Sequence, residues 1–203
     1  VAAVLLIVAG LAAAAWLSWP FALAGVAYVG LLTAYSAWLK HLVIVDVLVV
    51  ALGFVLRAVA GAVAIGVVIS GWLLICTILL ALFLALGKRR HEVLTLEAGA
   101  PSHRPILAEY SAGLLDQMIA VVTASTVTAY ALYTMSPETV AKFQTTLLPV
   151  TLPFVLYGIF RYLYLLYCRQ LGGNPSEIVL RDRALLVNTL LWLAAVVVII
   201  YWP

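Results

Sequence analysis

Long runs of apolar residues alternate with short polar segments along the whole chain. About 20 apolar residues suffice to cross a bilayer as a helix. The pattern predicts seven membrane-spanning helices, over residues 1–17, 21–36, 42–66, 70–86, 111–134, 145–168 and 184–201. Prolines and polar residues mark several ends, at Ser18-Trp19-Pro20 and Ser136-Pro137, and Pro149 and Pro153 should distort the sixth span. We therefore expect an all-α polytopic membrane protein.

Composition agrees with this pattern, because 67% of the residues are hydrophobic and only 9% are charged. A soluble domain of this size could not bury so much apolar surface. Alternating the spans across the bilayer puts only Lys142 on one side and most other cations on the opposite side: Lys40, Lys88, Arg89, Arg90, Arg104, Arg169, Arg181 and Arg183. Positive charge marks the cytoplasmic side. We expect a multi-pass membrane protein whose charged face is cytoplasmic.

The densest charge cluster is Gly87-Lys88-Arg89-Arg90-His91-Glu92, directly after the fourth span. It opens a polar segment, residues 88–109, that is too long for a tight turn. Ala98-Gly99-Ala100-Pro101 should divide this segment into a helical extension of the fourth span and a second short piece. Such a segment is typical of a cytoplasmic binding loop or lid. A basic cluster at a span end can also serve only to set topology. Both interpretations stay open at this point.

The third span carries an arginine in its middle. Asp46, Gly53 and Arg57 recur at helical spacing and share one face, with Arg57 roughly 16 Å along the axis from Asp46. An arginine at that depth costs at least ~2.5 kcal/mol, so it needs a partner or a wet cavity. One alternative is a structural pair with Asp46 or Asp116. The other is an anion pocket shared with Arg161 of the sixth span, because guanidinium groups recognise phosphate oxygens well.

Neither the cysteines nor the histidines indicate a metal centre. Cys76 and Cys168 are far apart and lie in apolar surroundings, which argues against a disulfide framework. His41, His91 and His103 have no ligand spacing. We therefore expect no metal site formed by these residues alone.

Several motifs together resemble a known family. They are Tyr35-Ser36-x-x-Leu39-Lys40, Asp46, the stretch Gly53-Phe54-Val55-Leu56-Arg57-Ala58-Val59-Ala60-Gly61-Ala62, the cluster at 87–92, and the tail Gly172-Gly173-Asn174-Pro175-Ser176-Glu177 with Leu180-Arg181-Asp182-Arg183. The chain resembles the UbiA-type membrane prenyltransferase superfamily over about residues 30–200. Within it, the chain is similar to the polyprenyl-phosphate (decaprenyl-phosphate) phosphoribosyltransferase branch.

The resemblance implies a nine-helix bundle around a central cavity. It also implies an Asn-Asp-x-x-Asp motif that holds magnesium diphosphate, which this sequence lacks. The sequence thus departs from the family in having seven predicted spans and in lacking this motif. These two differences predict that the first two helices of the bundle are missing and that the Mg²⁺ ligands lie outside this sequence. The implied reaction transfers 5-phosphoribose from phosphoribosyl diphosphate to a polyprenyl phosphate lipid, and no nucleic acid takes part. The resemblance also implies that the protein lies in the bacterial inner (plasma) membrane with its active site facing the cytoplasm.

The resemblance and the charge pattern together nominate the site residues. We expect Asp46, Lys88 and Glu92 to be catalytic, with the two acids orienting the cations or touching the ribose hydroxyls. The expected phosphate contacts are Lys40, Arg57, Lys88, Arg89, Arg104 and Arg161. Arg90, Arg169, Arg181 and Arg183 are expected to act mainly as topology charges. Tyr35 and Tyr110 could donate hydrogen bonds, although tyrosine at a membrane interface is usually part of the aromatic belt.

Two other functions remain open. An aromatic prenyltransferase of quinone or haem biosynthesis would share the bundle but would need several acids after the fourth span, where only Glu92 lies between residues 88 and 96. An organic-anion transporter would place Arg57 and Arg161 in its pathway. Internal repeats would favour the transporter, and the spans show none.

Overall fold

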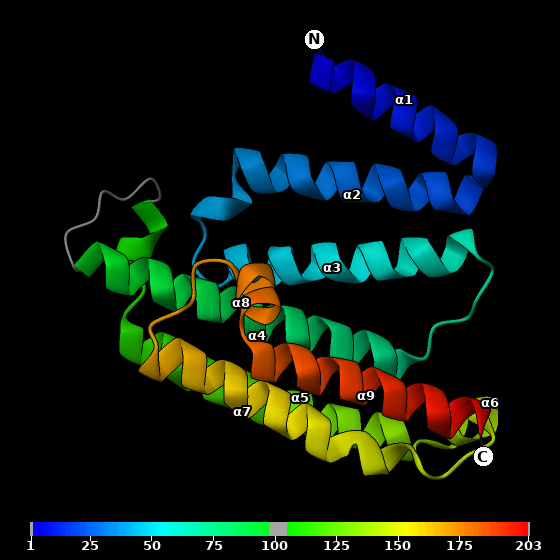
Figure 1. Ribbon diagram of the computed structural model, residues 1–203. Coiled ribbons are helices and arrows are strands. Elements are labelled where there is room, and N and C mark those ends of the chain that lie inside the picture. Colours follow the sequence, from blue (N-terminus) through cyan, green and yellow to red (C-terminus); the bar gives the residue numbers. More distant parts are fainter. Residues whose placement is uncertain (1, 98–104, 203) are drawn as a thin grey trace.

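The computed structural model of the protein describes residues 2–97 and 105–202, and these residues form helices joined by short connections. Figure 1 shows the long helices lying side by side, with α1 at one edge and α5, α7 and α9 grouped at the other. The helices are α1 Ala2–Leu17, α2 Trp19–Ala37, α3 Val45–Ala64, α4 Gly71–Glu97, α5 Ala112–Met135, α6 Pro137–Phe143, α7 Leu152–Cys168, α8 Pro175–Arg181 and α9 Arg183–Tyr201. Three short 3₁₀ turns supplement them, η1 Leu39–His41, η2 Pro105–Glu109 and η3 Leu148–Thr151.

The predicted all-α membrane fold is confirmed. Within the described residues, six helical segments are long and apolar enough to cross a bilayer: α2, α3, α4 through Thr95, α5, Leu148–Cys168 and α9. The first predicted span is a shorter apolar helix over Leu5–Leu17. Six of the seven predicted spans therefore reach spanning length in this part of the chain.

The predicted helix ends follow from local chemistry. Ser18, Ser111 and Ser136 each accept a hydrogen bond from a backbone N–H of the first turn that follows, and so cap α2, α5 and α6. The two prolines of the sixth span act as expected. The segment starts as the 3₁₀ turn η3, which contains Pro149, and becomes α-helical only at Leu152, with Pro153 in its first turn.

The helical extension expected at the start of the polar segment 88–109 is present in the structure. Helix α4 does not end with the apolar run but continues through the charged cluster to Glu97. Lys, Arg and Glu are good helix formers, and neither glycine nor proline interrupts residues 88–97. The predicted break at Ala98-Gly99-Ala100-Pro101 lies outside the described residues, and the chain is described again at η2.

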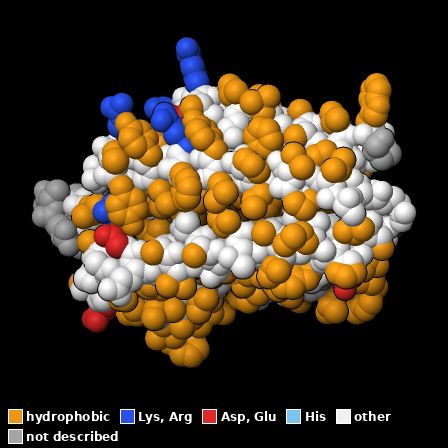
Figure 2. Space-filling view, turned by 90° about the horizontal axis from the view of Figure 1, so that it is seen from below, with side chains coloured by type: hydrophobic (Ala, Val, Ile, Leu, Met, Phe, Trp, Pro, Cys, Tyr) orange, Lys and Arg blue, Asp and Glu red, His pale blue; other side chains and the backbone are white. Residues whose placement is uncertain are grey.

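The core lies among α3, α4, α5, α7 and α9 rather than around the first two helices. Fully buried apolar side chains from these later elements form one cluster, among them Val47, Leu86, Leu115, Ile119 and Leu166. Figure 2 shows apolar side chains covering the middle of one face, with the visible lysines and arginines near one end. This distribution suits a bundle whose apolar outer surface meets lipid and whose charged end meets water.

Candidate functional site

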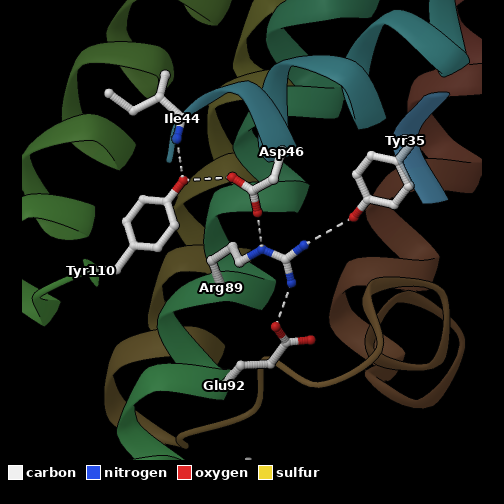
Figure 3. A network of polar contacts seen from close by, with 6 residues as sticks. All are labelled: Tyr35, Ile44, Asp46, Arg89, Glu92 and Tyr110. Atoms are coloured by element: carbon white, nitrogen blue, oxygen red, sulfur yellow. Dashed lines mark hydrogen bonds and ion pairs between the residues drawn. The ribbon is translucent and has the colours of Figure 1, made fainter. Parts of the chain in front are cut away.

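The charged turn of α4 packs against the first turn of α3 through Arg89. The Nε of Arg89 donates to Oδ2 of Asp46 at 2.7 Å, and its Nη1 donates to Glu92 one turn later. The Nη2 of Arg89 lies 3.4 Å from the hydroxyl of Tyr35 on α2. Figure 3 shows these groups converging on one guanidinium. Asp46 is fully buried and Arg89 is 4% exposed, so the contacts compensate a charge that water barely reaches.

Tyr110 extends this network to the chain segment that follows η2. Its hydroxyl donates to Oδ1 of Asp46 at 2.6 Å and accepts the backbone N–H of Ile44 at 2.7 Å. Burial and the bond to Asp46 raise the pKa of Tyr110 well above its usual range, so the hydroxyl keeps its proton. Ile44 has a φ of +69°, which a β-branched residue adopts only under constraint. The network thus holds a strained turn in front of α3.

Arg90 also forms an ion pair, on a different side of α4 from Arg89. Its Nε donates to Oδ1 of Asp116 on α5 at 2.6 Å, and Tyr167 of α7 donates to the same oxygen at 2.9 Å. The Tyr167 ring centroid lies 4.0 Å from the guanidinium carbon of Arg90. Arg90 thus links α4 to α5 through Asp116 and to α7 through Tyr167. Since it is only 8% exposed, it has a packing role besides any effect on topology.

Lys88 differs from its two neighbours. It is exposed, and no described residue forms an ion pair or hydrogen bond with it. Lys88, Arg89 and Arg90 carry three positive charges, and Asp46, Glu92 and Asp116 carry three negative ones, so the group is formally neutral. Because Arg89 and Arg90 hold all three carboxylates, Lys88 is the cation of this turn without a carboxylate partner among the described residues, and an added anion would meet it first.

The other nominated cations lie apart from this cluster or have partners of their own. Lys40 is half-buried on η1, ahead of α3. Arg57 is exposed, and it lies against the rings of Phe54 and Tyr28 at 4.5 and 5.5 Å from their centroids. Arg57 does not pair with Asp46 or Asp116, because Arg89 and Arg90 bind these two acids. Arg104 lies outside the described residues.

Arg161 forms a two-pronged ion pair with Asp182. Its Nε and Nη2 donate to the two carboxylate oxygens at 3.1 and 2.8 Å. Asp182 also caps α9 by accepting the backbone N–H of Leu185 at 2.8 Å. One carboxylate therefore fixes both the middle of α7 and the start of α9.

We expect this carboxylate to make stability depend on pH. The hydrogen bond from Arg161 lowers the pKa of Asp182, so the stabilisation is present above the ordinary carboxyl pKa and is lost as the pH falls through the lowered value. Asp182→Asn retains a capping side chain but loses the charge, and should cost about 1 kcal/mol of unfolding free energy at neutral pH. Unfolding in detergent at several pH values should show this difference shrinking in acid. A difference that grows in acid would contradict the assignment.

The described residues do not form a magnesium site. No group of three or more Asp, Glu, His or Cys side chains among them is arranged to hold a metal ion. Both oxygens of Asp46 already accept hydrogen bonds, from Arg89 and Tyr110. The carboxylates of the cluster hold arginines in place instead.

An apolar cavity of about 550 Å³ lies among α4, α5, α7 and α9, in the apolar part of the bundle. Phe83, Tyr162 and Trp192 belong to its lining. The hydroxyl of Tyr162 is buried without a hydrogen-bond partner among the described residues, and it lies 3.7 Å from the position that a Cβ on Gly87 would take. Tyr162 therefore lies between the cavity and Gly87, the residue that precedes Lys88.

Sequence reasoning named most of these residues but did not predict which of them pair with one another. The i, i+3 spacing of Arg89 and Glu92 was a usable signal for their ion pair. The aspartate directly before α9 was a usable signal for a helix cap. No local signal marks Tyr110 as the partner of Asp46, because these residues are 64 positions apart.

Comparison with known proteins gives a consistent result. No family model matches the chain. It is 28% identical to the decaprenyl-phosphate phosphoribosyltransferase of Mycolicibacterium smegmatis, over 98% of this chain and 64% of that protein. The proteins of the same name from Corynebacterium glutamicum and Mycobacterium tuberculosis are each 31% identical, over 86% and 91% of this chain and 52% and 60% of theirs.

The chain thus spans 52% to 64% of the length of these curated relatives. The alignments run through the α3–α4 region and most of the remaining helices, since they cover at least 86% of the chain. The resemblance predicted from the sequence motifs is confirmed: the chain is similar, over most of its length, to the decaprenyl-phosphate phosphoribosyltransferases.

Proposed function

We propose that the protein transfers 5-phosphoribose from phosphoribosyl diphosphate to a polyprenyl phosphate. An oxygen of the lipid phosphate forms a bond to the anomeric carbon of the ribose. The bond from that carbon to the diphosphate oxygen breaks, and diphosphate leaves with the electron pair. The observation that carries the proposal is the similarity to three proteins named for this chemistry over 86% to 98% of the chain.

The architecture supports an amphipathic substrate. The bundle contains an apolar cavity of about 550 Å³ among α4, α5, α7 and α9, and α4 also bears Lys88, so an apolar lipid chain and its phosphate would find suitable surroundings on the same helix.

The residues of the cluster divide into two roles in this proposal. Lys88 contacts substrate phosphate, because it is the exposed cation of the turn. Arg89 is buried and already holds Asp46 and Glu92, which favours a positioning role over direct contact. Glu92 remains 24% exposed and is the carboxylate that could touch a ribose hydroxyl. Lys40, Arg57, Arg104 and Arg161 remain candidates for further phosphate contacts.

Mg²⁺ is part of the proposal as a companion of the diphosphate group. The described residues do not supply its ligands, and no step here depends on it. The residues of this chain would act by positioning and by charge stabilisation, which account for most of the catalysis in reactions of this kind.

The direct test uses the protein expressed from its complete reading frame and purified in detergent. With magnesium, radiolabelled phosphoribosyl diphosphate and a polyprenyl phosphate, we expect a labelled lipid product. A parallel reaction offers a polyprenyl diphosphate and 4-hydroxybenzoate. Prenylation of the aromatic acid, with no labelled lipid in the first reaction, would replace the proposal with the aromatic prenyltransferase alternative.

We propose further that the charged end of the bundle faces the cytoplasm of a bacterial inner membrane. With Cys76 and Cys168 replaced by serine, a cysteine at the exposed Arg181 of α8 should react only with reagent on the cytoplasmic side. A cysteine at Glu138 of α6 should react only from outside, since α6 lies at the opposite end of α5 from the cluster. Reversed labelling would contradict the proposed orientation.

A further inference from the structure

The connection between α7 and α8, residues 169–174, lies directly on the charged turn of α4. Gly172 makes the closest approach: a Cβ at this position would lie 2.4 Å from the Cβ of His91 and 2.9 Å from Cδ1 of Leu166. Real Cβ atoms are not found so close to other atoms, and the Cβ of His91 is fixed by the helix backbone. Glycine is therefore required at residue 172 by lack of space.

The end of α7 directs the chain onto α4. Gln170 has a φ of +54°, and the backbone N–H of Leu171 donates to the carbonyl of Leu165 at 3.0 Å, which turns the chain back at the helix end. Figure 1 shows the segment rising from α7 and crossing α4 before it enters α8. His91 is thereby packed under Gly172. A Cβ on Gly173 would lie 3.5 Å from the imidazole, which is an ordinary contact distance.

The side chains of this turn point in different directions around α4. An α-helix advances about 100° per residue, so Gly87, His91, Lys88, Glu92 and Arg89 follow one another around the axis in that order. Gly87 contacts α7, and Arg89 contacts α3. Lys88 therefore lies between His91, under the connection, and the Asp46–Arg89–Glu92 network.

His91, next to Lys88, is a second side chain that can donate a hydrogen bond to a ligand. No described residue forms an ion pair or hydrogen bond with its imidazole. Imidazole offers at least one N–H in either protonation state. A phosphate monoester presents several acceptor oxygens, more than one ammonium group satisfies, and Arg89 and Arg90 are already held by carboxylates.

We propose that Lys88 and His91 form a subsite for a phosphate monoester, and that Gly172 is the positioning residue that holds the α7–α8 connection against His91. This inference rests on the proposed function, which supplies two such groups, the 5-phosphate of the donor and the phosphate of the lipid. The chemistry of recognition is the same for both.

Binding measurements test the subsite separately from catalysis. Equilibrium binding of ribose 5-phosphate and of a short-chain polyprenyl monophosphate would be measured on the complete protein in detergent. His91→Leu retains bulk but no donor, and should weaken one of the two probes about 10-fold or more, the range expected for a lost bond to a charged group. His91→Gln retains an N–H and should restore most of that loss. The probe that responds identifies the source of the phosphate.

A pair of adjacent glycines supplies the matched control. Gly172→Ala should weaken the same probe as His91→Leu, because its Cβ cannot fit unless the connection lifts from His91. Gly173→Ala, whose Cβ would be in ordinary contact, should stay within about twofold of wild type. Unchanged binding of both probes by His91→Leu overturns the subsite, whether or not Gly172→Ala folds. Absence of phosphoribosyl transfer by the wild-type protein would overturn the proposed function instead.

Discussion

Asp46→Ala is expected to lower the free energy of unfolding by about 3–5 kcal/mol, the range for removing one partner of a buried ion pair. The reason is that Arg89 would remain buried at 4% exposure with its Nε unpaired, and Tyr110 would lose the acceptor of its hydroxyl. Urea or thermal unfolding of the purified protein in detergent measures the loss.

A matched control for this change is Glu177→Ala, which removes an ion pair from the exposed surface of α8. Arg181 and Glu177 are 80% and 47% exposed, so this variant should change stability by less than about 0.5 kcal/mol. Equal losses of unfolding free energy in the two variants would show that the buried Arg89 network stabilises the protein no more than an exposed ion pair does. Asp46→Asn should fall between wild type and Asp46→Ala, because the amide still accepts hydrogen bonds but carries no charge.

Lys88→Ala is expected to lower phosphoribosyl transfer about 100- to 1,000-fold while the protein remains folded and inserted, which is the usual effect of removing one preorganised charge stabiliser. The side chain is exposed and has no partner among the described residues, so its loss should leave the packing of α4 unchanged. Initial rates with both substrates at saturation measure the effect, and the yield of monodisperse protein reports on folding.

The control for Lys88 is Arg183→Ala, a cation at the start of α9 that is exposed and lies outside the cluster. Its removal should leave the rate within about twofold, as is usual for surface changes. A large loss of folded protein in Lys88→Ala, with the specific activity of the remainder intact, would assign this lysine a structural role. Similar rate losses in both variants would point to a general effect of positive charge at this end of the bundle.

The Arg89 network also shows where sequence reasoning reached its limit. The sequence placed Asp46 at the start of a helix and Arg89 and Glu92 one turn apart on another, and α3 and α4 confirm these positions. It assigned Arg89 to phosphate, whereas the structure binds it to two carboxylates and places Tyr35 beside it. Which acid neutralises which base depends on how the helices pack, and one-dimensional spacing does not contain that information.

Arg57 and Arg161 illustrate the same limit. Both stand out in the sequence as arginines within apolar spans, which predicts that each needs a partner or a wet cavity. In the structure Arg161 takes Asp182 from the start of the next helix, and Arg57 lies against Phe54 and Tyr28. Neither contact brings these guanidinium groups together, so a pocket shared by the two arginines remains a prediction without support from the described contacts.

The sequence by itself determined the all-helical membrane class, most span boundaries and the resemblance to the decaprenyl-phosphate phosphoribosyltransferases. These properties depend on run length, local capping residues and motifs, which are local in the chain. Only the tertiary structure decided that Arg89 and Arg90 are neutralised, that Lys88 stays open and that Gly172 lies on His91. Each of these facts joins residues from different helices. Close packing and the cost of burying an unpaired charge select one partner among several that the sequence allows.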